Sequence, residues 1–389
     1  MATLTHLLWG GLFMPSALHS VRVLDVSTTV AGAWCSRLLA GLGADVVMLE
    51  PPAGHPTRAL QPKDSTGVSI LATYVLSGKR SVTLDLDTAD GQNRARQIAA
   101  RMDVVVSSAR PSELAARGMR YAELHASSLV MAHVTAHGMS GPLAEISGND
   151  LTAAARSGWA SINGYSTRSP LKPAVWSASL CTGIAAASAI TAALFHRDRH
   201  PGEGQEVDVA EVEVLAGMFA PPLLGAEYSG VPLRRRDPSD LLGGPVLVND
   251  GHFALTLSRA HFWRDAMNLL GLTDLADDAR WGTMHYRQEH RDEYVVRVAE
   301  AMGQWDKAEL FDELAIRRVV AGPVLTMAEL ARNEHLQSRG FWVASDGGAA
   351  AEVPGAPFRM SATPFDMGGH ATAPGADSAV ILEEVEAER

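Results

Sequence analysis

The sequence predicts an α/β protein, with a Rossmann-like, doubly wound parallel sheet and a second, smaller α+β domain. Its 389 residues exceed what a single hydrophobic core usually organises, so we expect two domains. Strand and helix patterns alternate through the first half of the chain, as is typical of a parallel sheet covered by helices. We predict residues 21–230 as the first part of the large domain, 231–330 as the small domain and 331–389 as a return to the large domain.

The large domain begins with a β-α-β unit. Residues 21–26 and 45–50 are almost continuously apolar, which favours buried parallel strands, and 34–42 form a helical pattern that Gly43 closes. The alternation continues with strands at 81–86, 104–107 and 129–135, a helix at 89–101 and a short helix after Pro111. Such a series predicts helices on both faces of one sheet.

Beyond residue 150 the pattern becomes mainly helical. We expect helices at 150–159 and 177–199, then a strand at 205–210 that leads into an apolar helix. Residues 234–245 are charged and rich in Pro and Gly, which indicates a linker. The small domain after it should contain a strand at 252–257 and helices near 262–270, 287–302 and 305–316, and the tail has short extended pieces at 351–357 and 358–361.

Composition excludes several classes of protein. The 33 Lys and Arg against 44 Asp and Glu give a formal charge of −11, which would repel a nucleic-acid backbone. The only cysteines, Cys35 and Cys181, are too few for a disulfide framework and favour a reducing cytoplasm. Because the net charge is negative, any anionic ligand must be held by a local basic cluster.

Two apolar segments raise the question of a membrane. The first twenty residues lack the basic region and cleavage site of a signal peptide, so we interpret them as a docking arm or the result of a misplaced start codon. Residues 178–194 are slightly short for a span and consist mainly of small side chains, which suits a tightly packed helix. We expect a cytoplasmic protein that binds no membrane.

Motifs for common cofactors are weak or absent. The turn at 25–32 contains no G-x-G-x-x-G, although the backbone N–H groups near Ala31 and Gly32 could donate hydrogen bonds to a phosphate oxygen. A purely structural role for this glycine is as plausible. Arg58, and Lys79 with Arg80, place basic groups in loops at strand ends, where a phosphorylated ligand or only solvent would meet them. The pair His285 and His290 is not a metal motif and no C-x-x-C occurs, so we expect no metal.

Short fragments in a fixed order carry a family resemblance. They lie at 24–32, 38–47, 50–58, 79–86, 103–111, 138–150, 157–158, 202–209, 250–251 and 354–357. Each is weak alone, but in this order they resemble the family III CoA transferases, the CaiB/BaiF group that includes formyl-CoA transferase and α-methylacyl-CoA racemase. The resemblance extends from about residue 21 to residue 365.

The resemblance implies a fold, a reaction and a ligand. Family members are interlocked dimers, in which each chain builds a large Rossmann-like domain from both of its ends. Their transferases move CoA between two carboxylic acids, after an aspartate attacks the donor thioester to form a mixed anhydride. The residues expected to contact CoA are Thr29, Val30, Ala31, Arg58, Lys79 and Arg80.

The catalytic residues of the family are altered in this chain. The aspartate of relatives lies four residues before a glycine and fifteen before a leucine, and both Gly183 and Leu194 place Ser179 there. A neutral hydroxyl is a poor nucleophile toward a thioester. The histidine of the racemases corresponds to Asn149, which cannot exchange a proton near neutral pH. Asp150 is the nearest acid, either a site residue or a cap at a helix start.

Three functions follow from these residues. The first is a CoA-transferase-like enzyme that acts on an acyl-CoA and a carboxylic acid through Ser179, Asn149 and Asp150. The second is a catalytically silent subunit, since a homodimer or a heterodimer with a second family member can keep the fold with one working site. The third is a CoA-thioester lyase or hydratase, or a racemase-like enzyme, on the same binding site.

Overall fold

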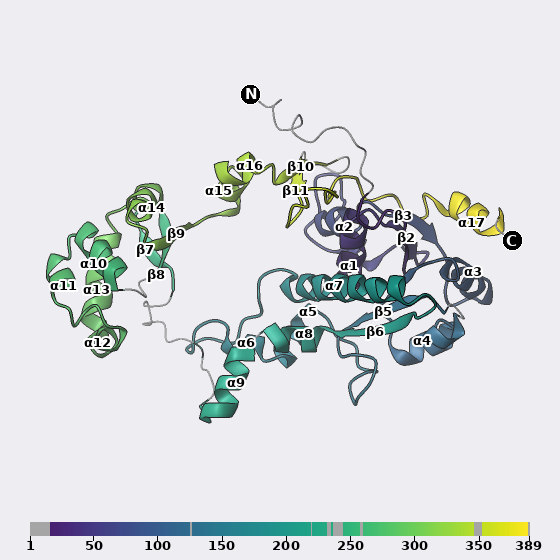
Figure 1. Cartoon of the computed structure of the whole chain (residues 1–389), viewed down its shortest axis with the longest axis horizontal. Coiled ribbons are helices and arrows are strands. Elements are labelled where there is room, and N and C mark those ends of the chain that lie inside the picture. The colour runs from purple at the N-terminus through teal and green to yellow at the C-terminus, as the bar shows by residue number, and fades with distance from the viewer. Residues whose placement is uncertain are drawn as a thin grey trace. The chain divides into compact units, whose positions relative to one another are not determined.

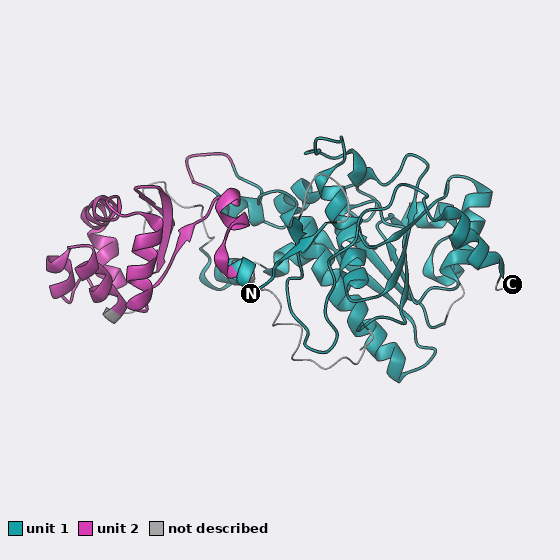
Figure 2. Ribbon diagram, turned by 90° about the horizontal axis from the view of Figure 1, so that it is seen from above, with its two compact units in different colours: residues 1–164, 170–234, 336–389 teal, residues 165–169, 235–335 magenta. Residues whose placement is uncertain are grey.

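The computed structural model describes residues 16–124, 127–218, 220–231, 235, 244–256, 260–345 and 352–387. Most of the apolar N-terminal arm and most of the linker at 234–245 lie outside these residues. The chain forms two compact units (Figure 2). Unit 1 comprises residues 1–164, 170–234 and 336–389, and unit 2 comprises 165–169 and 235–335.

A six-stranded sheet with the order β3-β2-β1-β4-β5-β6 forms the centre of unit 1. All of its paired strands are parallel, which confirms the doubly wound parallel sheet. The strands are β1 (Arg22–Asp25), β2 (Asp45–Glu50), β3 (Arg80–Thr83), β4 (Val104–Ser107), β5 (Val130–Thr135) and β6 (Gln205–Ala210). The order reverses between β1 and β4, the point where open α/β sheets hold ligands at the carboxyl ends of strands.

Alternate residues of β1, β2, β4 and β5 enter two separate cores. Val23 of β1 packs on the face covered by α1 (Val30–Gly41) and α7 (Ser177–Arg199). Leu24, the next residue, packs on the face covered by α3 (Ala89–Ala99) and α4 (Pro111–Arg117). This alternation follows from the two-residue period of a strand, and both faces are apolar because helices cover both (Figure 1).

Shorter helices complete the first part of unit 1. They are α2 (Ile70–Val75), α5 (Asp150–Arg156), α6 (Trp159–Ile162), α8 (Glu211–Met218) and α9 (Ala220–Ser229), with single 3-10 turns at Pro56–Ala59 and Tyr121–Glu123. The single helix predicted at 150–159 is wrong, because Gly158 with φ of 85° separates α5 from α6. Helix α2 escaped prediction because six residues are too few to show a helical period.

Helix α7 runs the length of the sheet with its small residues buried. Ala178, Gly183, Ala186 and Ala187 are among its buried positions. The helix is long and apolar enough to cross a membrane, but half of its most apolar stretch is already buried inside unit 1. One such helix is weak evidence for a membrane span, since the core helix of a soluble protein has the same properties.

The C-terminal segment completes unit 1, and its last helix packs beside β3. It contains β10 (Trp342–Ala344), β11 (Glu352–Pro354) and α17 (Ser378–Ala387). Strands β10 and β11 pair antiparallel, whereas the extended piece predicted at 358–361 forms no strand. The backbone N–H groups of Ser81 and Thr83 donate to the side chains of Asp377 and Ser378, so the tail satisfies the free edge of β3.

Unit 2 has its own sheet and core. Antiparallel strands β7 (Val246–Val248), β8 (Gly251–Thr256) and β9 (Val320–Val324) pair in the order β7-β8-β9. Helices pack against them: α10 (Ala260–Leu269), α11 (Thr273–Asp277), α12 (Met284–Glu289), α13 (Arg291–Met302) and α14 (Lys307–Ile316). Phe253 and Trp263 are almost fully buried in this core. The helix predicted at 287–302 is instead two helices that meet at His290.

The chain leaves unit 2 through α15 (Met327–Ala331) and returns to unit 1 through α16 (Glu334–Ser338). The α+β character of the smaller part is confirmed, with more strand than the single segment predicted. Strands β7 and β9 have only three and five residues, too short for their periodicity to stand out from neighbouring turns.

Candidate functional site

Three helix starts meet at the carboxyl ends of β5 and β6. Helix α5 begins at Asp150, Ser179 lies in the first turn of α7, and Glu211 is the first residue of α8, directly after β6. Helix α7 lies along β5 and β6 and leads into the start of β6, which places the N-terminus of α7 at the carboxyl edge of the sheet (Figure 1). The fold therefore brings together side chains that are distant in sequence, at the edge where α/β proteins bind ligands.

Ser179 is held by two carboxylates. Its backbone N–H donates to Oδ1 of Asp150 at 3.1 Å, and its Oγ donates to Oε1 of Glu211 at 2.9 Å. The exposed fractions of Ser179, Asp150 and Glu211 are 4%, 3% and 5%. Two of the predicted catalytic residues, Ser179 and Asp150, thus lie in contact, together with an acid that the sequence analysis did not select.

The carboxyl of Glu211 is unusually easy to protonate. Burial, helped by the negative charge of Asp150, raises its pKa from 4.5 to about 7, although the hydrogen bond from Ser179 works in the opposite direction. The carboxyl is therefore close to half ionised at neutral pH. Such a group serves well in catalysis, since its two protonation states differ little in free energy.

The carboxylate of Asp150 has a positively charged partner, whereas the carboxyl of Glu211 has only the hydroxyl of Ser179 among the described residues. Its Oδ2 accepts a hydrogen bond from Nζ of Lys172 at 2.9 Å, and its Oδ1 is occupied by Ser179. The ammonium of Lys172 also donates to the carbonyl oxygens of Pro173 and Val175. Val175 has φ of 49°, a left-handed conformation that is strained for a β-branched residue. The segment before α7 is therefore tied to Asp150 through Lys172.

Asn149 acts as the N-cap of α5. Its Oδ1 accepts hydrogen bonds from the backbone N–H groups of Leu151 and Thr152, both at 3.1 Å. The hydroxyl of Thr152 in turn accepts from the backbone N–H of Asn149 at 2.8 Å. This reciprocal cap fixes the start of α5, and with it the position of Asp150.

His137 also approaches this region. The backbone N–H of Val212, next to Glu211, donates to the carbonyl of the adjacent Ala136 at 3.2 Å. A Cβ on Gly148 would lie 3.3 Å from Nε2 of His137. The imidazole is 8% exposed, and neither ring nitrogen has a hydrogen-bond partner among the residues described. Burial, with the positive charge of Arg156, lowers its pKa.

The residues predicted to contact CoA in the first turn are part of a helix start. The hydroxyl of Thr29 caps α1 by accepting from the backbone N–H of Gly32, while Val30 and Ala31 are buried in the first turn. Lys79 is buried too: its Nζ donates to Asp25, Ser36 and the carbonyl of Ala33. Lys79 thus lies beside α1 and forms a buried ion pair with Asp25.

The two predicted arginines keep some exposed surface. Arg58 forms a two-pronged ion pair with the buried carboxylate of Glu50, at 2.7 and 2.8 Å, and its side chain is 21% exposed. Arg80 pairs with Asp45 and Glu384, and its side chain is 31% exposed. Both guanidinium groups are therefore compensated by carboxylates.

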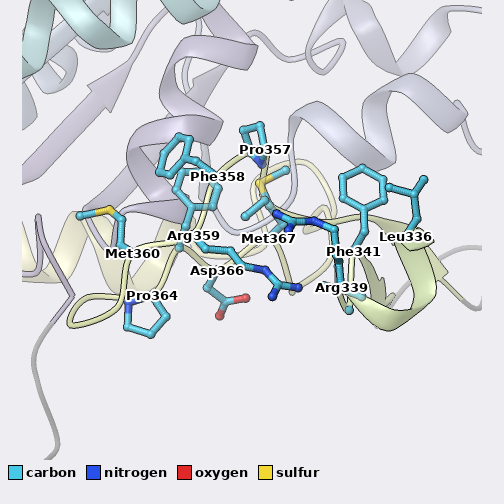
Figure 3. A pocket seen from close by; sticks show the side chains of 14 residues that line it. Leu336, Arg339, Phe341, Pro357, Phe358, Arg359, Met360, Pro364, Asp366 and Met367 are labelled. Atoms are coloured by element: carbon cyan, nitrogen blue, oxygen red, sulfur yellow. The ribbon is translucent and has the colours of Figure 1, made fainter. Parts of the chain in front are cut away.

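A pocket of about 490 Å³ lies elsewhere in unit 1. Its lining residues lie within 336–343 and 356–367 of the C-terminal segment and include Arg339, Phe358 and Arg359, whose side chains Figure 3 shows around the opening. None of the predicted catalytic or CoA-contacting residues lines this pocket.

One group of potential metal ligands was missed in the sequence. His196 and His200 have H-x-x-x-H spacing at the end of α7, and with Glu203 they place ligand atoms within 4.8 Å of one another. All three side chains are exposed, and Nε2 of His196 is already 3.0 Å from Oε2 of Glu203. The geometry equally suits a surface ion pair.

Comparisons with known proteins agree in one family. A sequence model of CoA-transferase family III matches residues 18–378. The chain is 31% identical over 383 residues to the succinate–glutarate CoA-transferase of Agrobacterium fabrum, covering 95% of this chain and 96% of that protein. It is 32% identical over 384 residues to subunit BbsE of the succinyl-CoA:(R)-benzylsuccinate CoA-transferase of Thauera aromatica, covering 93% of each.

A solved structure supports the same assignment. The crystal structure of a CaiB/BaiF family protein from Brucella suis is 28% identical in sequence and matches with a TM-score of 0.86, covering 95% of this chain and all of that one. The family match spans nearly the whole chain and includes both compact units. The chain therefore belongs to CoA-transferase family III.

Proposed function

We propose that this protein is a CoA-transferase that moves CoA from an acyl-CoA to a free carboxylic acid. The family match over residues 18–378 carries the proposal. The dicarboxylic substrates in the names of the relatives from Agrobacterium and Thauera suggest succinyl-CoA as the first donor and glutarate as the first acceptor. The reaction as proposed uses no metal ion.

The proposed site is the carboxyl edge of β5 and β6. Ser179 occupies the position of the family nucleophile, Asp150 holds its backbone, and Asn149 fixes Asp150 by capping α5. CoA would bind at the turn and loops that contain Thr29, Val30, Ala31, Arg58, Lys79 and Arg80. Arg58 and Arg80 keep exposed surface for a phosphate, while the buried Lys79 would act by shaping its loop.

The direct test is a transfer assay on the purified protein. The protein is incubated with succinyl-CoA and a panel of acids that includes glutarate and benzylsuccinate, and new acyl-CoA products are measured by mass spectrometry. We expect a product that requires both donor and acceptor. Hydrolysis of the donor, or its rearrangement without an acceptor, would instead favour a lyase, hydratase or racemase-like activity.

A silent subunit is the second candidate, and the hydroxyl of Ser179 at the nucleophile position favours it. One relative is itself named as a subunit of a CoA-transferase. In that case CoA should raise the melting temperature, because a ligand that binds only the folded state stabilises it, while no acid in the panel is converted. Transfer would then appear only after mixing with a second family member.

The assembly and location are part of the proposal. We propose an interlocked dimer in the cytoplasm, with the two compact units as the two domains of each chain. Native mass spectrometry distinguishes a homodimer from a monomer that awaits a different partner. A monomer that transfers CoA at full rate would contradict the interlocked assembly.

A further inference from the structure

The family reaction needs a carboxylate, and this chain offers one beside the altered position. Glu211 follows β6 directly and reaches the hydroxyl of Ser179 at 2.9 Å. We propose that Glu211 is the nucleophile of this chain, and that it replaces the aspartate whose position Ser179 occupies. This proposal rests on the proposed CoA-transferase function and names the residue that performs it.

The geometry leaves one oxygen of Glu211 available. Oε1 accepts from Ser179, whereas Oε2 has no hydrogen-bond partner among the described residues. The Ser179 hydroxyl thus orients the carboxyl without occupying both oxygens. Since Glu211 has one more methylene group than aspartate, it can start from a neighbouring element and still place its carboxyl next to Ser179.

Asp150 is less suited to attack a thioester. Both of its oxygens are engaged, one by the backbone N–H of Ser179 and the other by the ammonium of Lys172. Attack would require breaking one of these charge-assisted contacts. Asp150 is therefore a positioning residue, which holds Ser179 and keeps negative charge near Glu211.

A serine nucleophile would not achieve CoA transfer. If Ser179 attacked the thioester, the acyl group would remain on the protein as a serine ester and CoA would leave. No CoA thioester would then remain on the protein for an acceptor carboxylate to attack. A carboxylate nucleophile, by contrast, forms an anhydride, which is reactive enough to be converted back into a thioester. The proposed function therefore requires a carboxyl nucleophile, even with a hydroxyl beside it.

The steps balance without any further reactant. Oε2 of Glu211 attacks the thioester carbonyl, a C–O bond forms, the C–S bond breaks, and CoA leaves as the thiolate with the electron pair. The thiolate then attacks the glutamyl carbonyl, and the donor acid leaves as its carboxylate. The acceptor carboxylate attacks the resulting glutamyl-CoA thioester, and the released thiolate attacks the acceptor acyl carbonyl, which yields the new acyl-CoA and restores Glu211.

Hydroxylamine trapping identifies the nucleophile. The purified full-length protein is incubated with succinyl-CoA or glutaryl-CoA, treated with hydroxylamine, digested and mapped by mass spectrometry. We expect a hydroxamate on Glu211, because hydroxylamine cleaves a glutamyl-CoA thioester at the side-chain carbonyl. An acyl group on Ser179, or transfer activity without modification of Glu211, would overturn the proposal.

The outcome separates this proposal from the proposed function. A hydroxamate on Glu211 in a protein that converts no acceptor would support the nucleophile and reject the complete transfer. Product formation with Glu211 unmodified would support the transfer and reject the nucleophile. Absence of both would reject both.

Variants provide an independent readout. Glu211→Gln preserves an acceptor for the Ser179 hydroxyl and should lower transfer on the order of 10³-fold or more. Glu213→Gln is the matched control, because Glu213 lies on the same turn of α8 but is exposed, and it should leave the rate unchanged. The double variant Ser179→Asp with Glu211→Gln should regain transfer and carry the hydroxamate at residue 179. Full activity in the single Glu211→Gln variant would refute the assignment.

Discussion

Two buried carboxyl groups of unit 1, Asp25 and Glu211, differ in the groups that stabilise their negative charge. Burial alone would raise the pKa of Asp25, but the ammonium of Lys79 and the hydroxyls of Ser27 and Ser36 together hold it below its usual range. Glu211 has one hydroxyl donor and faces the negative charge of Asp150, so its pKa rises to about 7. Asp25 is consequently a fixed anion that supports the fold, whereas Glu211 changes its charge near neutral pH.

The raised pKa of Glu211 predicts a pH-dependent stability. Between about pH 4.5 and about pH 7 the folded chain holds a proton on Glu211 that the unfolded chain has released. The free energy of unfolding should therefore fall as pH rises through this window, relative to Glu211→Gln, by about 3 kcal/mol in total. Urea unfolding of both proteins at several pH values measures the difference.

The neighbouring groups define the control for this experiment. Asp150 with its partner Lys172, and Ser179, are common to both proteins, as is the hydrogen bond from Val212 to Ala136, the residue before His137. The difference between the two curves therefore reports Glu211 together with its electrostatic coupling to Asp150. Glu213→Gln should give a curve parallel to that of the wild type, and a parallel curve for Glu211→Gln would show that the pKa is not raised.

The sequence predicts the candidate site only in part. Ser179 and Asp150 were selected from spacing and a family resemblance, and the structure places them in contact. Glu211 was missed because it stands between an expected strand and an expected apolar helix, where an acid is an ordinary first-turn residue. Only the return of α7 and β6 to one sheet edge brings it beside Ser179, and such a contact is not visible in local patterns.

At the scale of elements, the close contact of α1 and α7 holds Ser179 in place. Gly183, one turn after Ser179, faces α1, where an added Cβ would lie 2.7 Å from the carbonyl oxygen of Ala31 and 2.8 Å from Cδ1 of Trp34. The carbonyl of Ala31 is part of the backbone of α1, so it cannot move aside as a flexible side chain would. A glycine here therefore sets the distance between the helix that carries Ser179 and the turn predicted to contact CoA.

We predict that Gly183→Ala separates these helices. The free energy of unfolding should fall by about 1–3 kcal/mol or more, because the added methyl group overpacks a backbone contact. Transfer activity should fall as well, since Ser179 moves with α7. Circular dichroism melts and the transfer assay measure the two effects.

Gly225→Ala in α9 is the matched control. A Cβ there meets nothing within 4 Å, so the alanine should stabilise the helix by about 0.5–1 kcal/mol. Equal stability for Gly183→Ala and the wild type would mean that α1 and α7 tolerate a wider separation than the structure indicates.

Long elements with a clear period were predicted better than short ones. The strands of the parallel sheet and helix α7 were expected from their apolar patterns and are present. The strand predicted at 81–86 is instead Arg80–Thr83, because the chain leaves the sheet after Thr83 and enters a turn at Leu86 that leads to α3. Helix α17 was missed, although Asp377 directly before it is a residue type that often begins a helix.

At the scale of the whole molecule, helix α17 near the C-terminus shares one hydrophobic core with the strands of the first hundred residues. Ile381 and Val385 of α17 are 2% and 6% exposed and pack with Leu24 and Val82 of the central sheet. The backbone N–H of Gly78 also donates to the carbonyl of His370, at 3.2 Å. The sequence between these contacts includes all of unit 2, so folding of unit 1 must close a very long loop.

The last prediction concerns this closure. Ile381→Ala combined with Val385→Ala removes two buried aliphatic side chains from one face of α17 and should lower the free energy of unfolding of unit 1 by about 4–8 kcal/mol. Glu383→Ala combined with Glu386→Ala changes exposed positions of the same helix and should alter it by less than about 1 kcal/mol. Urea unfolding with hydrogen exchange of β1 and β3 compares the pairs. The sheet should lose protection only in the first variant, because its edge and one face depend on α17; equal protection in both would mean that the sheet is stable without the C-terminal segment.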